Sequence, residues 1–179
     1  MTKTLTLGLI AAAALFASAQ AQVPAPGGPP GPGGPPPPPR ARGPSAALAV
    51  EAAQTAIATC LANGYKTTAT VVDSAGVPVV ILTGDGAPER TQGVGLTKTW
   101  AVVTYKMSSG DVLAKSKTDP AMDAAIKANP KIGTVRQGAL PLMVGGELIG
   151  AMSVSGAPGG DKDEVCVKAG IDKVASRLK

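Results

Sequence analysis

The chain of 179 residues contains no histidine. Without an imidazole, the Ser-His-Asp and Cys-His arrangements of nucleophilic catalysis are excluded, as are imidazole metal sites and proximal-histidine haem ligation. Aromatic residues are also scarce, at 2% of the chain, and the charges of its body are mixed in sign. Because a nucleic-acid-binding surface normally combines a basic stripe with aromatic side chains, the sequence disfavours a nucleic-acid partner.

Only one long apolar run is present, at the very start of the chain. It covers Leu5–Ala17, follows Lys3 and precedes small residues at Ala19 and Ala21. This order is typical of a secretory signal, and the run is too short to span a bilayer. We therefore predict a signal peptide over residues 1–21, cut after Ala21 or Ala19, and a periplasmic or secreted protein without a membrane span. A retained membrane anchor is the alternative.

Proline and glycine dominate the next segment, residues 22–44, which includes five consecutive prolines at Pro35–Pro39. This composition cannot bury a core, so we predict a disordered linker. Two roles remain open for it, a solvated spacer and a tether or docking arm for a protein partner. Residues 45–179 are enough for one domain with one core.

The body shows the element order of an α+β domain. We expect, in chain order, a helix over 46–64 with Ser45 as N-cap, a hairpin over 65–83, a helix over 91–107, short helices within 108–138, a hairpin over 140–155 and a final helix capped by Asp161. This order favours a central antiparallel sheet with the N-terminal and C-terminal helices packed together on it. The predicted apolar stripes are Val50, Ala53, Ile57, Cys60 and Leu61 in the first helix, Leu96, Trp100, Val103 and Met107 in the second long helix, and Val167, Ile171, Val174 and Leu178 in the last.

The two cysteines lie at opposite ends of the body. Cys60 is near the end of the first helix and Cys166 is near the start of the last. If these helices cover one face of the sheet in antiparallel orientation, the two cysteines become neighbours, and a disulfide is the first expectation in an oxidising compartment. Two buried free thiols are the alternative.

A glycine-rich turn joins the last strand to the last helix. Gly156, Gly159 and Gly160 precede backbone N–H groups that can form an anion nest for a carboxylate or phosphate. Three acidic residues between positions 161 and 164 already place negative charge there. A tight turn with a self-capped helix is therefore the favoured interpretation, an anion nest is the alternative, and the turn alone does not identify a ligand.

Several of these motifs together resemble the GlcG/HbpS haem-binding family. The resemblance rests on DGAPERT at 85–91, on Lys98, on the ATC of the first helix and on the run from GALPLMV to EVCVKAGI at 138–171. It covers residues 45–179. The resemblance implies an α+β fold, assembly into homo-oligomers that are often octamers, and haem binding or sensing, without one reaction common to all members. Exported relatives look to carry the same two cysteines, which supports the bridge.

The chain departs from the family where many exported relatives have histidine, because Arg90 stands there, followed by Thr91. The resemblance implies a ligand site that contains Asp85, Arg90, Thr91, Lys98 and Tyr105. Arginine is not an ordinary iron ligand, so haem would be held by its propionates on Arg90 and Lys98, with Tyr105 or a methionine near the iron. Simpler roles stay open: packing for Tyr105, turn formation for Asp85, and a salt bridge to a neighbouring subunit for Lys98.

The sequence thus favours an exported, non-catalytic binding protein for haem or another anionic small molecule, acting in sensing or sequestration. The alternative is an oligomeric structural or interaction module that has lost haem ligation and meets a partner through its proline-rich arm. Without histidine, a hydrolytic site would need a Ser-Lys or paired-carboxylate arrangement, and no spacing in the sequence indicates either.

Overall fold

The computed structural model describes residues 41–179. The predicted signal peptide and most of the predicted linker lie outside the described residues. The elements are α1 (Ala46–Ala62), β1 (Thr68–Asp73), β2 (Pro78–Thr83), α2 (Arg90–Tyr105), α3 (Ser109–Ser116), α4 (Pro120–Ala128), β3 (Ala139–Val144), β4 (Glu147–Ser155), α5 (Gly160–Val174) and the 3₁₀ turn η1 (Ala175–Arg177). The four strands form one antiparallel sheet in the order β2-β1-β4-β3. The predicted α+β class and element order are confirmed.

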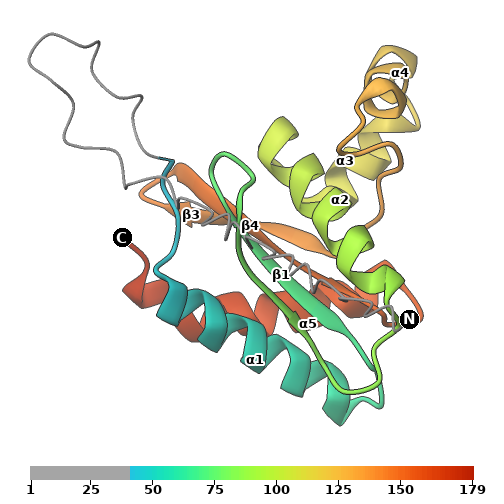
Figure 1. Cartoon of the computed structure of the whole chain (residues 1–179). Coiled ribbons are helices and arrows are strands. Elements are labelled where there is room, and N and C mark those ends of the chain that lie inside the picture. Colours follow the sequence, from blue (N-terminus) through green and yellow to red (C-terminus); the bar gives the residue numbers. More distant parts are fainter. Residues whose placement is uncertain (1–40) are drawn as a thin grey trace, which may run out of the picture. The chain divides into compact units, whose positions relative to one another are not determined.

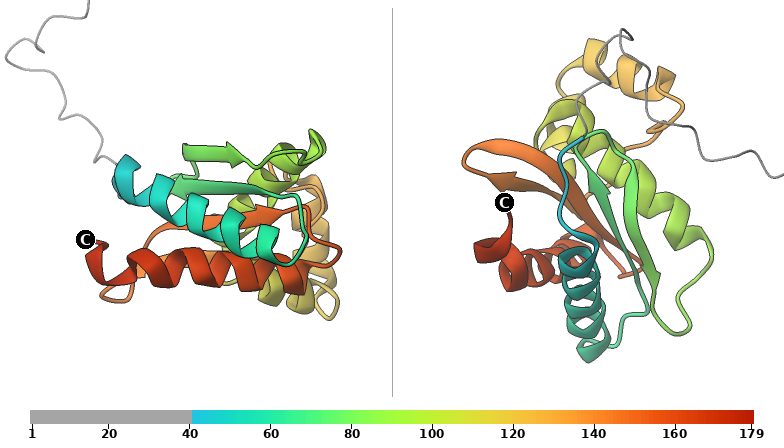
Figure 2. Two further views of the ribbon diagram at one scale, coloured as in Figure 1. Left: turned by 90° about the horizontal axis from the view of Figure 1, so that it is seen from below. Right: turned by 60° about the vertical axis from the view of Figure 1, so that its left-hand side comes forward.

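Helices cover both faces of this sheet. Figure 1 shows α1 and α5 side by side and antiparallel on one face, with α2 on the opposite face. The two further views in Figure 2 show the same arrangement. At the exposed end of this pair, a hydrogen bond connects α1 to the 3₁₀ turn that follows α5: Arg177 Nη2 donates to Glu51 Oε1 at 2.8 Å. The N-terminal and C-terminal helices therefore pack together on the sheet, as predicted.

A disulfide joins α1 to α5 at the other end of this pair. Cys60 and Cys166 are bonded across a sequence separation of 106 residues, with Cα atoms 5.5 Å apart, and both are buried. The expected bridge is therefore present, and no free cysteine remains in the described part of the chain. Such a bond is typical of proteins in oxidising compartments.

The contact between α1 and α5 is made of small residues, and this differs from the predicted stripe. Val50 and Leu61 were expected in the core but are 37% and 59% exposed. The buried residues of α1 are Ala49, Ala52, Ala53, Ala56 and Cys60. The helices approach so closely that a Cβ on Gly170 would lie 2.5 Å from the carbonyl oxygen of Ala52. Alanine, whose methyl group allows this approach, therefore takes the buried face.

The sheet face under α2 carries hydroxyl groups, whereas the opposite face is apolar. Ser153 Oγ donates to the carbonyl oxygen of Gly95 at 2.9 Å, and Thr68 Oγ1 lies 2.7 Å from Thr91 Oγ1. The predicted stripe of α2 is confirmed only in part, since its members pack half-buried against hydrophobic clusters while Gly95, Lys98 and Thr99 are buried. A hydrophobic pattern with a period of 3.6 residues detects the large apolar side chains of a helix. It does not detect small and polar side chains that pack against the sheet.

The close contact at Gly95 predicts how a substitution there changes the free energy of unfolding. A Cβ at this position would lie 2.6 Å from Thr70 Oγ1, whereas Gly93, on the same helix, has no atom within 4 Å of its Cβ position. We expect Gly95→Ala to lower the free energy of unfolding by about 1–3 kcal/mol through overpacking. The control Gly93→Ala should raise it by about 0.5–1 kcal/mol, because alanine favours the helix. Denaturant melts of both variants test this, and equal effects would contradict the close packing of α2.

The first described residues run along the turn between β1 and β2. Arg42 exchanges hydrogen bonds with Ser74 through its backbone and pairs through its guanidinium with Glu147 at the start of β4.

Among the described residues, no helix is long and apolar enough to cross a bilayer.

Candidate functional site

A pocket of about 470 Å³ opens where the N-terminal ends of α2 and α5 meet the end of β4. Its lining includes six of the residues singled out in the sequence: Arg90, Thr91, Lys98, Gly156, Gly159 and Gly160. They are separated by up to 70 positions in the chain, and only the fold brings them together. The volume lies within the range of small-molecule sites, roughly 300–1,000 Å³.

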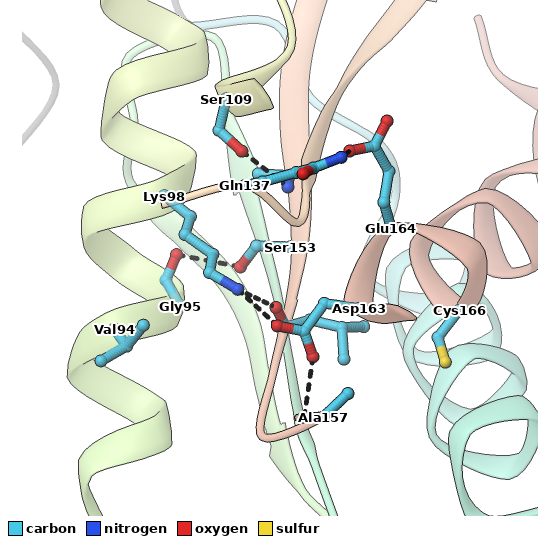
Figure 3. Close-up of polar contacts among 12 residues, drawn as sticks. Val94, Gly95, Lys98, Ser109, Gln137, Ser153, Ala157, Asp163, Glu164 and Cys166 are labelled. Atoms are coloured by element: carbon cyan, nitrogen blue, oxygen red, sulfur yellow. Dashed lines mark hydrogen bonds and ion pairs between the residues drawn. The ribbon is translucent and has the colours of Figure 1, made fainter. Parts of the chain in front are cut away.

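Lys98 forms a buried ion pair in the wall of this pocket. Its side chain is 2% exposed, and Nζ donates to Asp163 Oδ2 at 2.7 Å and to the carbonyl oxygen of Val154 at 2.8 Å. Figure 3 shows Lys98 reaching from α2 to Asp163 at the start of α5. We expected its acidic partner to be a ligand or a neighbouring subunit, but the partner belongs to the same chain.

Burial acts against the charges of this pair. It lowers the pKa of Lys98, and the nearby carboxylate of Asp163 partly offsets that effect. Burial likewise raises the pKa of Asp163, and the nearby Lys98 ammonium opposes the rise. Each charge is therefore held in place by the other, and removing either one leaves a buried charge without its partner.

The glycine turn is closed by the same carboxylate. Asp163 Oδ1 accepts a hydrogen bond from the backbone N–H of Ala157 at 3.0 Å, so one residue of α5 ties the turn to the helix. Gly156 has φ +131°, and a Cβ there would lie 2.4 Å from the carbonyl oxygen of Lys66, so the position requires glycine. The turn thus shows part of the self-satisfied arrangement that the sequence favoured.

The helix that follows begins without a side-chain cap. We expected Asp161 to cap it, but the N-cap lies two residues earlier, at Gly159, so that α5 starts at Gly160 and makes no side-chain cap hydrogen bond. The N-cap of α2, Glu89, likewise makes no side-chain cap bond. Two helix N-termini without a side-chain cap therefore border one pocket, and Asp161 and Asp163 in the first turn of α5 offset part of the positive charge there.

Two arginines add full positive charge to this border. Arg90 is the first residue of α2, and Arg136 lies in the segment just before β3; both are exposed. Arg136 was missed in the sequence, because nothing in its local pattern links it to Arg90 and only the path of the chain after α4 places it there. A guanidinium presents several donors in one plane and suits a carboxylate or phosphate.

The remaining lining is largely apolar. It consists of Val94, Leu113, Val135, Ala157 and Pro158, together with Ser155 and with Gln137, whose amide donates to Glu164 Oε2 at 2.8 Å. The hydroxyl of Thr91 already has hydrogen-bond partners in the chain, because it donates to the Pro88 carbonyl and contacts the hydroxyl of Thr68. Thr91 therefore adds little hydrogen-bonding capacity for a ligand. The pocket therefore combines a positive border with an apolar wall, which suits an organic anion.

The structure does not bring two of the predicted site residues to the pocket. Asp85 is exposed in the loop before α2 and does not line it. Tyr105, at the other end of α2, packs against a hydrophobic cluster that includes Val112 and Met122. Its position favours the packing role that we left open for it.

A larger hollow of about 740 Å³ lies near the C-terminal end of α2, beside the turn between β3 and β4. Its two charged residues, Lys106 and Glu147, have opposite signs, and Glu147 is already paired with Arg42. None of the predicted site residues lines it, so the smaller pocket is the candidate site.

Comparison with known proteins assigns the family. The model of the family described as "Haem degrading protein HbpS-like" matches residues 45–172. A crystal structure of HbpS superposes with a TM-score of 0.67 at 25% identity, covering 73% of this chain and 89% of that one. A double mutant of HbpS from Streptomyces reticuli gives 0.64 at 28% identity, covering 75% and 86%.

A more distant structure, a complex of PduOC with haem, shares the fold, with a TM-score of 0.61 at 17% identity and coverage of 70% and 91%. No curated protein sequence matches the chain. The family match spans most of the body and agrees with the resemblance seen in its motifs. The chain therefore belongs to the HbpS-like family.

Proposed function

We propose that the pocket between α2 and α5 binds a carboxylate-bearing small molecule, with haem as the first candidate. The observation that carries this proposal is the pairing of Arg90 and Arg136 with two uncapped helix N-termini around an apolar wall. Carboxylates would receive charge-assisted hydrogen bonds from the guanidinium groups, and the apolar body of the ligand would lie against Val94, Leu113 and Val135.

Haem fits this site in one respect and not in another. Its two propionates match the two arginines, in place of the contact with Lys98 that we first expected. The iron finds no ordinary ligand, because the pocket lining contains no cysteine, methionine or tyrosine and the chain has no histidine. Within the described residues there is also no group of three or more metal-binding side chains. The lining residues present therefore suit the carboxylates of haem but not its metal.

We further propose that the protein binds its ligand without turnover. Proton transfer needs an acid or base with a free position toward the substrate. The two buried titratable groups at the pocket, Lys98 and Asp163, hydrogen-bond to each other and to the backbone. Haem incubated with the protein and a reductant in air should lose its Soret band no faster than haem incubated with the reductant alone; protein-dependent acceleration of this loss would contradict this part of the proposal.

Export and assembly belong to the same proposal. The disulfide and the N-terminal apolar run support a periplasmic or secreted binding protein that acts in sensing or sequestration. Assembly into homo-oligomers, with octamers as the size that the family resemblance implies, would be checked by native mass. The second candidate, a structural or interaction module with a proline-rich docking arm, is favoured by the lack of an iron ligand in the pocket lining.

A titration separates these two candidates. Haem added to the full chain should shift its Soret band and saturate, because the pocket withdraws it from water. Arg90→Ala and Arg136→Ala should each weaken binding by about fivefold to tenfold, since each loses a charge-assisted hydrogen bond to a propionate. Lys115→Ala is the matched control, because it removes one exposed positive charge from α3 outside the pocket. It should bind as the unchanged chain does.

Two results would count against the binding function. One is the absence of a saturable spectral change with any tetrapyrrole, together with an unchanged melting temperature. The other is equal weakening by all three substitutions, which would mean that only the net charge of the protein attracts the ligand. Either result would favour the structural candidate.

A further inference from the structure

In residues 41–179, the side chains that most often bind haem iron all lie away from the pocket. Among the described residues, Tyr105, Met107 and Met122 belong to the cluster formed with α3 and α4. Met152 is part of the core under α1 and α5, and Tyr65 packs against that core. Met143 lines the separate hollow at the other end of α2. The two cysteines are joined in the disulfide and cannot act as thiolates.

The two candidate donors inside the pocket are already engaged. Lys98 Nζ hydrogen-bonds to Asp163 and to the Val154 carbonyl, and a neutral amine is needed to bind a metal. Both carboxylate oxygens of Asp163 accept hydrogen bonds, one from Lys98 and one from the Ala157 N–H. Freeing Lys98 for a metal would break the buried ion pair, and freeing Asp163 would also break the bond that closes the glycine turn.

From this arrangement we infer that the site recognises its ligand independently of any metal. The inference rests on the proposed function and makes it specific: the ligand class is a molecule with an apolar body and at least two carboxylates, and an iron-free porphyrin is bound as well as haem. The arginines recognise the carboxylates and the apolar wall holds the ring, whereas the centre of the ring receives no bond from this chain.

The choice of carboxylates also follows from the positions of the arginines. They come from separate segments, Arg90 from the start of α2 and Arg136 from the segment before β3, and both border the same opening. A ligand with two carboxylates engages both, whereas a ligand without them leaves two guanidinium groups facing an apolar body. Esterification of the carboxylates should therefore matter more than removal of the metal.

Three probes test this on the full chain: haem, iron-free protoporphyrin IX, and protoporphyrin IX dimethyl ester. Binding is followed by quenching of the single tryptophan, Trp100, and by porphyrin absorption. We expect haem and protoporphyrin IX to have dissociation constants within about threefold of each other, and the dimethyl ester to bind at least about tenfold more weakly. Arg90→Ala and Arg136→Ala should reduce the preference for the free acid over the ester, whereas Lys115→Ala should not.

The outcomes separate this inference from the function on which it rests. If haem binds more than about tenfold tighter than protoporphyrin IX, the iron has a ligand, for example from a second copy of the chain, and the inference is wrong while the proposed function stands. If the ester binds as well as the free acid, carboxylate recognition is wrong as well. If none of the three probes binds, the proposed function itself fails.

Discussion

Replacing both cysteines by alanine is expected to lower the free energy of unfolding by about 4–5 kcal/mol in the chain-entropy model. The physical reason is the length of the closed loop, since Cys60 and Cys166 are 106 residues apart. Without the bond, the unfolded chain gains all the conformations that the closed loop forbids. Because single domains have a net stability of about 5–15 kcal/mol, this loss is large enough to unfold part of the population near body temperature.

The test compares three proteins by urea denaturation: the native chain, the Cys60→Ala/Cys166→Ala variant, and native chain reduced while unfolded and then refolded in reductant. Reduction must precede refolding because both sulfurs are buried. If loop entropy dominates, the reduced chain and the double variant lose similar stability and both show a larger dependence on denaturant concentration. A reduced chain that unfolds at the same urea concentration as the native protein would contradict the role of the bridge.

Breaking the buried ion pair is expected to have the second large effect. Asp163→Asn should lower the free energy of unfolding by about 3–5 kcal/mol, because it leaves the charge of Lys98 buried without a counter-charge. Asparagine can still accept the Ala157 N–H bond, so the glycine turn keeps its closure and the loss is assigned to the charge. The measurement is again urea denaturation, at pH 7.

A double variant supplies the control for this pair. Lys98→Met with Asp163→Asn removes both charges and leaves the apolar stem of residue 98 nearly unchanged in volume. The double variant should be more stable than Asp163→Asn alone, since no uncompensated charge remains. If the two single substitutions simply add in the double variant, Lys98 and Asp163 do not interact as the structure indicates.

The pH dependence of Asp163→Asn follows from the pKa of Lys98. Burial lowers this pKa, and the substitution removes the carboxylate that counteracts the lowering. Between the lowered pKa of the folded state and the normal value of 10.5, the folded chain binds fewer protons than the unfolded chain. The stability of the variant should therefore rise as the pH increases through this interval, relative to the native chain. A parallel pH profile for the two proteins would show that residue 98 is not a desolvated cation.

The sequence predicted the fold more completely than the site. Alternating strands, helix caps and turn glycines are local signals, and they were sufficient for the element order and for the antiparallel sheet. The disulfide was also predictable, because antiparallel packing of the first and last helices on one sheet face is enough to bring the two cysteines together. The stripes of α1 and α2 were predictable only in part, since both helices pack through alanine, glycine and threonine, which carry little hydrophobic periodicity.

The site could be predicted only in part, for a different reason. The family motifs and the glycine turn identified six lining residues, but a sequence contains no direct signal for contacts between distant segments. Arg136 was missed for that reason, and Asp163 was assigned to the helix dipole although it pairs with Lys98. Tyr105 was included as a side chain that could lie near the haem iron in the absence of histidine, yet the helix carries it to another cluster.

A crystal structure of the full chain with protoporphyrin IX tests the central claim most directly, because it locates the ligand without reference to affinity. The account predicts that the porphyrin lies against Val94 and Val135, with its carboxylates within hydrogen-bond distance of Arg90 and Arg136 and with the Lys98–Asp163 pair intact. A porphyrin bound elsewhere, or one whose carboxylates point away from both arginines, would contradict it.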